Sequence, residues 1–400
     1  MWQWRDRHDV NGFSGGAISR RRFAMTRMGT RALLLLALAC ASPCSWAQRP
    51  PLVVPRDADA VLERLPRGYA KLEPGIASDP VTLTQVNRLL AVAAASGDAR
   101  LAARAERLIA RLPAAQAGPG VQMARAYAAQ YRHDFPAALR LLDGIIATDP
   151  RDGDARLTRA QVQLVRGRID RARSDCAALT VGVDTSLGLV CLSALSLRIG
   201  NLDTAAKLAD RWLSAAGGDD PMRRHMLVIR AEAAARVGND RADQLFGQAL
   251  RASPHDVRTL AAYARYLRSM GRDRQVLALL SNAPDNDGLH LQRALAAHAA
   301  RTPETRMLAG VQARRYRLAR DLGSEPELRD EAEFWLTVRG DYARALQLAL
   351  RNFKTQRDYE DVDLLRRAAL AAKRPQALLA LQHWEKSQGL PSHVDDGESK

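Results

Sequence analysis

Residues 165–170 read VRGRID, an apolar helical stretch that ends at a glycine and continues with polar residues. Closely related phrases recur along the chain: RIGNLD at 198–203, RVGNDR at 236–241, SMGRDR at 269–274 and VRGDYA at 338–343. Successive glycines are 33, 38, 33 and 69 residues apart, and the last interval is close to two copies. A repeat of this length is typical of arrays of helical hairpins. The recurring glycine therefore decides the fold.

Each part of the repeat has a physical role. Glycine adopts the left-handed backbone conformation that ends a helix, and Asp, Asn or Arg then begins a second helix. Small residues recur at the eighth and twentieth positions of the unit, where crossing helices must approach closely. These small residues are Ala126, Ala138, Ala160, Ala172, Ser193, Ala205, Ala231, Ala242, Ala264 and Ala345. A single hairpin exposes an apolar stripe, which stacking of neighbouring hairpins buries.

The pattern resembles the tetratricopeptide repeat. The stretch RGDYARAL at 339–346 matches the turn of that family at Gly340, Asp341, Tyr342 and Ala345. This resemblance implies an all-α fold, a right-handed superhelical solenoid of antiparallel helix hairpins. Composition agrees, because the chain is rich in the helix formers Ala, Leu and Arg and only 5% of its residues are aromatic.

The chain is predicted to contain four segments. We expect a signal peptide over 1–47 and an N-terminal linker with a capping helix over 48–78. Residues 79–388 are predicted to form the array, with about eight hairpins and one degraded copy near residue 305. Residues 389–400 read as a disordered, solvated tail.

The first segment predicts export. Arginines precede the apolar run ALLLLALACA at 32–41, and small residues at Ser45 and Ala47 suit a cut before Gln48. The reading frame could also begin at Met25 or Met28. A twin-arginine signal at 19–23, a retained membrane anchor and a lipid anchor are alternatives. We expect a periplasmic protein without a stable membrane span in its mature form.

The charge suits an acidic partner. The 400 residues carry a net charge of +16, and removing residues 1–47 leaves +11. Arginine holds carboxylates with two parallel bonds, although an arginine-rich composition also reflects a GC-rich genome. We expect no nucleic-acid partner, because basic residues are not gathered with interleaved aromatics and export separates the chain from nucleic acids.

Motifs for catalysis are missing from the sequence. It contains no paired-histidine metal motif, no phosphate-binding glycine loop with a lysine and no Cys-x-x-Cys pair. GFSGG at 12–16 matches a hydrolase nucleophile motif, but it precedes the apolar run and has no strand and helix around it. We therefore expect no enzyme, no catalytic residue, no cofactor and no metal.

Two cysteines remain after removal of the first segment. Cys176 is expected on the second helix of one hairpin and Cys191 on the first helix of the next, and these helices pack side by side. They could form a disulfide in an oxidising compartment. The favoured interpretation is two separate buried apolar residues, because the Cys191 side chain is expected to lean toward the groove of the array and away from Cys176.

In the family that the chain resembles, the first helix of each hairpin lines an inner groove. Carrying those positions over implies a partner-binding groove, which we call the inner face. Its residues are Tyr127, Gln130, Tyr131, Gln161, Arg198, Glu232, Arg236, Arg258, Arg265 and Arg268. Aromatic area and arginine charge together suit an extended peptide or a helix with acidic groups. The alternative is that these arginines are solvated helix residues.

The predicted function is an exported scaffold that binds a protein or peptide, acidic groups included, in envelope assembly or a related complex. One alternative is an enzyme, or an accessory subunit of one, with an unrecognised site. Another is a soluble carrier for a small ligand. The sequence predicts neither the identity of the partner nor the oligomeric state.

Overall fold

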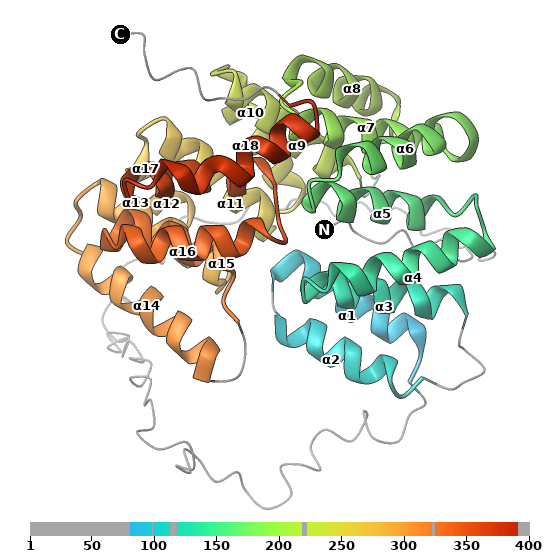
Figure 1. Cartoon of the computed structure of the whole chain (residues 1–400), viewed down its shortest axis with the longest axis horizontal. Coiled ribbons are helices and arrows are strands. Elements are labelled where there is room, and N and C mark those ends of the chain that lie inside the picture. Colours follow the sequence, from blue (N-terminus) through green and yellow to red (C-terminus); the bar gives the residue numbers. More distant parts are fainter. Residues whose placement is uncertain (1–80, 98, 113–117, 218–221, 322–324, 391–400) are drawn as a thin grey trace, which may run out of the picture. The chain divides into compact units, whose positions relative to one another are not determined.

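The computed structural model describes residues 81–390 except 98, 113–117, 218–221 and 322–324. The predicted signal peptide at 1–47, the linker and capping helix at 48–78 and all but the first two residues of the predicted tail lie outside these ranges. The described part is helical and contains no strand (Figure 1). This confirms the all-α prediction.

Consecutive helices pair as hairpins. The first five pairs are α1 (Leu83–Ser96) with α2 (Ala99–Ile109), α3 (Pro119–Tyr131) with α4 (Phe135–Thr148), α5 (Gly153–Val165) with α6 (Ile169–Ala178), α7 (Thr185–Arg198) with α8 (Leu202–Ala215), and α9 (Arg223–Arg236) with α10 (Arg241–Ala252). The others are α11 (Val257–Ser269) with α12 (Asp273–Leu279), α13 (Asp287–Ala299) with α14 (Thr305–Asp321), α15 (Leu328–Phe334) with α16 (Tyr342–Phe353), and α17 (Tyr359–Ala371) with α18 (Leu379–Ser387). Short π-helical turns, η3 (Leu179–Val183) and η4 (Trp335–Arg339), extend α6 and α15, and the 3₁₀ turn η5 (Pro375–Leu378) precedes α18. The described residues thus hold nine pairs, where the sequence predicts about eight.

The glycines end first helices as predicted. Gly167, Gly200, Gly238, Gly271 and Gly340 have φ angles of 67°, 82°, 68°, 67° and 65°. Gly97 ends α1 in the same way, at 67°. Where glycine is missing, His133, Arg301 and Lys373 take the left-handed conformation instead. The turn geometry therefore persists in hairpins whose sequence lacks its usual residue.

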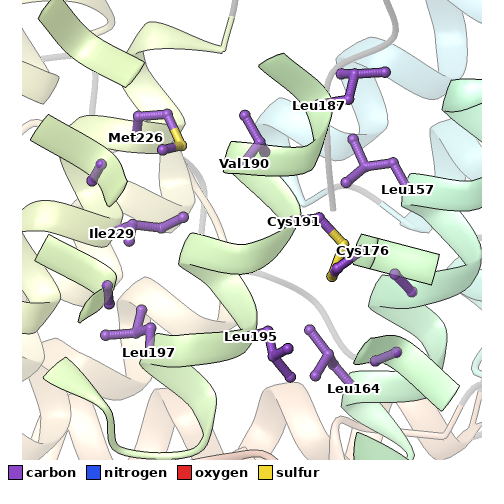
Figure 2. Close-up of a cluster of buried hydrophobic side chains, with 14 of the residues drawn as sticks. Leu157, Leu164, Cys176, Leu187, Val190, Cys191, Leu195, Leu197, Met226 and Ile229 are labelled. Carbon is purple, nitrogen blue, oxygen red and sulfur yellow. A yellow bond between two sulfur atoms is a disulfide. The ribbon is translucent and has the colours of Figure 1, made fainter. Parts of the chain in front are cut away.

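The small residues predicted at helix crossings lie in the core. Every one of them, from Ala126 to Ala345, has an exposed fraction of 0%. Larger apolar side chains fill the space between hairpins, and Figure 2 shows α5, α7 and α9 joined in this way by Leu164, Leu195 and Ile229. Stacking thus buries the apolar stripes, as the repeat physics requires.

Cys176 and Cys191 form a disulfide within this core, and their Cα atoms are 5.3 Å apart (Figure 2). The favoured interpretation as two separate residues was therefore wrong, although both side chains are buried. Cys191 does not lean toward the inner face, because α7 turns it toward α6, against Leu157 and Leu187.

The last hairpin returns to the third one. The indole nitrogen of Trp384 in α18 donates to the carbonyl of Gly167 at 2.9 Å, and Gln388 accepts from the amide of Ile169 at 3.0 Å. Just before α17, the amide of Arg357 donates to the carbonyl of Val165 at 2.7 Å. In an open array each hairpin contacts only its neighbours. Here the chain brings α17 and α18 back to α5 and α6.

No helix of the described residues is both long and apolar enough to cross a lipid bilayer.

Candidate partner-binding surface

The inner-face residues lie on the first helices of their hairpins, as predicted. α3 carries Tyr127, Gln130 and Tyr131, α5 carries Gln161, α7 carries Arg198, α9 carries Glu232 and Arg236, and α11 carries Arg258, Arg265 and Arg268. None of the ten is exposed. The side chains of Arg198 and Arg265 are 36% and 38% exposed, so these two arginines combine partners within the chain with contact to solvent. The surroundings of nine of the ten residues divide them into two groups, and Arg268 belongs to neither.

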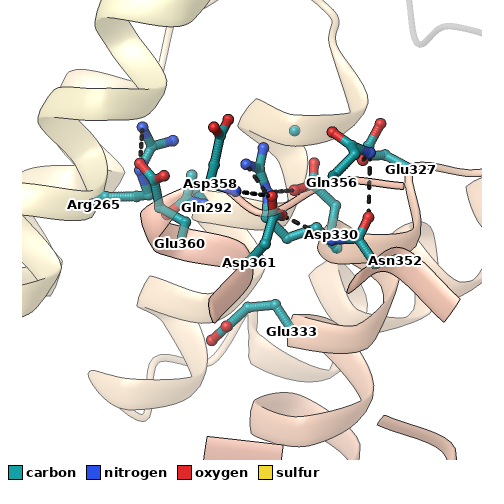
Figure 3. A network of polar contacts seen from close by, with 12 residues as sticks. Arg265, Gln292, Glu327, Asp330, Glu333, Asn352, Gln356, Asp358, Glu360 and Asp361 are labelled. Carbon is teal, nitrogen blue, oxygen red and sulfur yellow. Dashed lines mark hydrogen bonds and ion pairs between the residues drawn. The ribbon is translucent and has the colours of Figure 1, made fainter. Parts of the chain in front are cut away.

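The first group faces the start of α17. Arg198 forms an ion pair with Asp358, and the guanidinium of Arg236 lies 3.9 Å from the centre of the Tyr359 ring. Arg265 lies 3.5 Å from a carboxylate oxygen of Glu360 (Figure 3). It also lies 3.7 Å from a carboxylate oxygen of Glu232. The acidic partner suited to these arginines is thus present in the chain itself.

The start of α17 presents its acidic residues because they also begin the helix. Asp358 is the N-cap, and Asp361 closes a capping box with it. Asp361 accepts hydrogen bonds from the backbone amide of Asp358 and from the side chain of Asn352, both at 2.8 Å (Figure 3). Negative charge at this end also complements the helix dipole. Local capping and long-range pairing therefore use the same residues.

Arg268 has a different neighbour. Its guanidinium donates to the side chain of Gln292 in α13 at 3.2 Å. Burial lowers the pKa of Arg268, which the charge of Glu333 partly offsets. Arg268 thus contacts α13 through its side chain and is not among the arginines that meet the start of α17.

The pKa values show how strongly the charged residues at the start of α17 and the arginines around them influence one another. Burial raises the pKa of Glu360, but the charges of Arg265, Arg329 and Arg198 outweigh it and hold the value at about 2. Burial, the charge of Asp358 and that of Glu360 raise the pKa of Asp361 to about 7, against the opposing charge of Arg329. Glu360 is thus the anion that the arginines stabilise most.

The second group comprises Tyr127, Gln130, Tyr131, Gln161 and Arg258. The Tyr127 hydroxyl lies 3.3 Å from that of Thr158, and the Tyr131 hydroxyl donates to the carbonyl of Ala93 at 3.3 Å. Burial raises the pKa of Tyr127 to about 12. No hydrogen bond or ion pair of α17 reaches Gln130, Gln161 or Arg258 among the described residues.

Two buried amide atoms in the second group have no hydrogen-bond partner among the residues that the structure describes. They are Oε1 of Gln130 and Nε2 of Gln161. Burial and the charge of Arg224 lower the pKa of Arg258, although Asp256 opposes them. Arg258, Arg198 and Arg224 also help burial to lower the pKa of His225, which is therefore neutral at pH 7. This stretch of the inner face thus carries both positive charge and buried amide atoms.

The sequence prediction missed the acidic start of α17. Its signal is the run RDYEDVD at 357–363, which places four acidic residues at and just after a helix start. Nothing local to that run indicates that it meets residues far upstream. Among the described residues, no three histidine, cysteine, aspartate or glutamate side chains form a group that could hold a metal.

The helix pairs, left-handed turns and buried small residues define a class of protein: a repeat array of helix hairpins with a charged inner face. No protein-family model matches the chain, and no curated protein matches it. Two solved structures with which it shares similarity are tetratricopeptide repeat proteins. One, from Parabacteroides merdae ATCC 43184, is 17% identical, with 62% of this chain and 98% of that chain covered and a TM-score of 0.39. The other, the tetratricopeptide repeat domain of P58(IPK), is 15% identical, with 74% and 99% covered and a TM-score of 0.20.

Proposed function

We propose that this protein is an exported scaffold whose inner face binds a segment of a partner protein that carries acidic groups. The observation that supports this most is the docking of α17. Three inner-face arginines, Arg198, Arg236 and Arg265, contact the helix start formed by Asp358, Tyr359 and Glu360. The chain thereby illustrates the chemistry that its inner face recognises, an anionic and aromatic helix start.

The partner would bind the stretch that α17 leaves uncovered. There Arg258 offers a guanidinium, Gln130 a buried acceptor and Gln161 a buried donor. A carboxylate can pair with the guanidinium, while a peptide unit can supply a donor and an acceptor to the two amides. In this proposal an acidic peptide in extended conformation pairs with Arg258. The amide atoms of Gln130 and Gln161 are closed off from solvent, so the peptide reaches them only when neighbouring side chains move.

Export is part of the proposal. The signal-like features of residues 1–47 support it, as does the disulfide between Cys176 and Cys191, because disulfides persist mainly in oxidising compartments. The periplasm is the compartment that we propose, and envelope assembly is the setting. Mass measurement of the exported form tests this part: we expect a chain that begins at Gln48, and a chain that retains residues 1–47 would contradict it.

The binding proposal is tested by capturing partners from envelope extract with the full chain and with two variants. Arg258→Glu reverses the charge of the uncovered stretch. Arg241→Glu makes the same change on the exposed start of α10, away from the inner face. We expect Arg258→Glu to lose partners that Arg241→Glu retains, with both variants folded as judged by circular dichroism. Recovery of the same partners at the same yield with both variants would contradict the proposal.

A further inference from the structure

A separate pocket lies away from the inner face, between α4, α5 and α6. Its volume is about 480 Å³, within the range of small-molecule sites. The lining residues are Pro136, Leu139, Arg140, Asp143, Arg159, Gln163, Arg166, Arg168, Arg171, Ser174 and Asp175. They comprise five arginines and two aspartates, so the lining carries a net positive charge.

Arg159 engages both aspartates, and Arg156, outside the lining, also pairs with Asp175 at 3.4 Å. Arg159 donates to Asp143 at 2.7 Å and to both carboxylate oxygens of Asp175 at 2.9 and 2.7 Å. The other four arginines, Arg140, Arg166, Arg168 and Arg171, have no acidic partner in the part of the chain that the structure describes. Their positive charge is therefore not balanced within the pocket.

The fold concentrates this charge at the turn between α5 and α6. Arg166 and Arg168 flank Gly167, and Arg357 lies beside the same glycine because the last hairpin docks there. Burial and the charges of Arg166 and Arg171 lower the pKa of Arg168. Burial and the charges of Arg166 and Arg168 lower that of Arg357 in the same way. Each of these guanidiniums is destabilised by its neighbours, and a bound anion would offset that repulsion.

The lining of the pocket includes a buried polar group. Gln163 is only 5% exposed, and its Oε1 has no hydrogen-bond partner in the described part of the chain. A ligand that fits must therefore bring acceptors for the arginines together with a donor for this amide. Leu139 and Pro136 add apolar contact area beside these polar groups.

We propose that this pocket binds the phosphate group of a phosphate ester. A carboxylate has two oxygens, whereas a phosphate has three that are free to accept, which suits several arginine forks at once. A singly protonated phosphate also supplies a hydroxyl donor for Gln163. The volume leaves space for the group to which the phosphate is attached. That group belongs either to a soluble phosphate monoester or to phosphatidic acid, the lipid whose headgroup is a phosphate monoester.

The test uses the full chain, phenyl phosphate as the probe and benzoate as its carboxylate counterpart. Arg168→Gln removes one guanidinium from the pocket, and the Arg168 side chain makes no capping bond to α6, so the helix keeps its start. Arg173→Gln is the control, because Arg173 lies on α6 outside the pocket lining and pairs with Asp170. Calorimetry measures the affinity of the protein for each of the two probes. Flotation with vesicles that contain phosphatidic acid tests whether the protein binds a lipid headgroup.

We expect phenyl phosphate to bind more tightly than benzoate and to lose about tenfold in affinity with Arg168→Gln, the equivalent of one charge-assisted hydrogen bond. Arg173→Gln is expected to bind like the natural chain. Binding to vesicles alone, with the same dependence on Arg168, would identify the headgroup as the source. Three results would overturn the proposal. The first is that neither phenyl phosphate nor the phosphatidic acid vesicles bind. The second is an equal loss of affinity in Arg168→Gln and Arg173→Gln, and the third is that benzoate binds as tightly as phenyl phosphate. Because Arg258 lies outside this pocket, none of these results bears on the inner face.

Discussion

Gly167 links the local turn to the long-range fold. Its φ of 67° is one that side chains rarely adopt, and its carbonyl accepts the hydrogen bond from Trp384. A Cβ at this position would lie 2.8 Å from two atoms of the Trp384 ring and 2.9 Å from Cδ of Arg357. Gly271 has the same φ of 67°, but a Cβ there would meet no atom of the described residues within 4 Å. The two glycines therefore differ only in what packs against them.

This pair gives the first prediction. Gly271→Ala is expected to lower the free energy of unfolding by about 1–2 kcal/mol through backbone strain alone. Gly167→Ala should cost about 1–3 kcal/mol more, because Trp384 and Arg357 must also shift. Urea unfolding measures the free energy of unfolding of both variants. Equal losses would show that the last hairpin does not dock on this turn.

Glu360 gives a prediction about pH. Its pKa of about 2 lies below the ordinary value of 4.5 because three arginines surround it. A carboxylate with a depressed pKa in the folded state stabilises the fold above its unfolded pKa, and this contribution is lost as the pH falls through the window from 4.5 toward 2. The stability difference between the natural chain and Glu360→Gln should therefore be constant near neutrality and shrink below pH 4.5. A difference that grows on acidification would contradict the assignment.

At the scale of the elements, α17 is the helix whose start contacts the arginines of the inner face. Its start combines a capping box with three side chains that meet arginines of α7, α9 and α11. The repeat pattern predicts the inner-face arginines, because their positions follow from local spacing, but the acidic cap of α17 was not predicted. The pattern does not indicate that the arginines and the cap meet, since the contact depends on how all the intervening hairpins stack. The split of the inner face into a covered and an uncovered stretch follows from that stacking.

The pairing of Cys176 with Cys191 also depends on more than the local sequence. The repeat places Cys176 and Cys191 on adjacent helices, but which way each side chain turns depends on the path of η3 between them. Cys176 and Cys191 lie 15 residues apart. Closing a loop of that size stabilises a fold by about 3 kcal/mol in the chain-entropy model. We expect the double variant Cys176→Ala, Cys191→Ala to lose about this much on urea unfolding, and the natural chain to lose a similar amount when reduced. No change in either measurement would argue against the bond.

At the scale of the whole described unit, the array is tied together at points far apart in sequence. Trp384 and Gly167 are 217 residues apart, and Asn286 before α13 donates to the carbonyl of Ser96 at the end of α1 across 190 residues. The glycine spacing predicts a series of hairpins, but it contains no information about such ties. They require side chains, an indole and an amide, at turns that the repeat pattern does not specify. Open arrays unfold hairpin by hairpin, whereas ties of this kind couple distant hairpins.

Trp384→Ala tests this coupling. Removal of a buried tryptophan typically costs about 3–5 kcal/mol. Because the indole contacts the turn before α6, the amides of Arg168 and Ile169 should exchange faster with solvent, as well as those of α18. Trp212→Ala is the control, since Trp212 is also buried but bonds to Ser186 at the start of its own hairpin. Hydrogen-exchange mass spectrometry should show faster exchange at residues 168–169 only in Trp384→Ala, and its absence there would contradict the tie.

The central claim is that the inner-face arginines hold the acidic start of α17. A double-mutant cycle between Arg265→Met and Glu360→Gln, followed by urea unfolding, tests it most directly, because the two residues lie on α11 and α17 and are 3.5 Å apart at their nearest charged atoms. We predict a coupling energy of about 1 kcal/mol, since the pair is partly exposed to solvent. Additive losses, with coupling within about 0.3 kcal/mol of zero, would contradict the claim that α17 docks on this face.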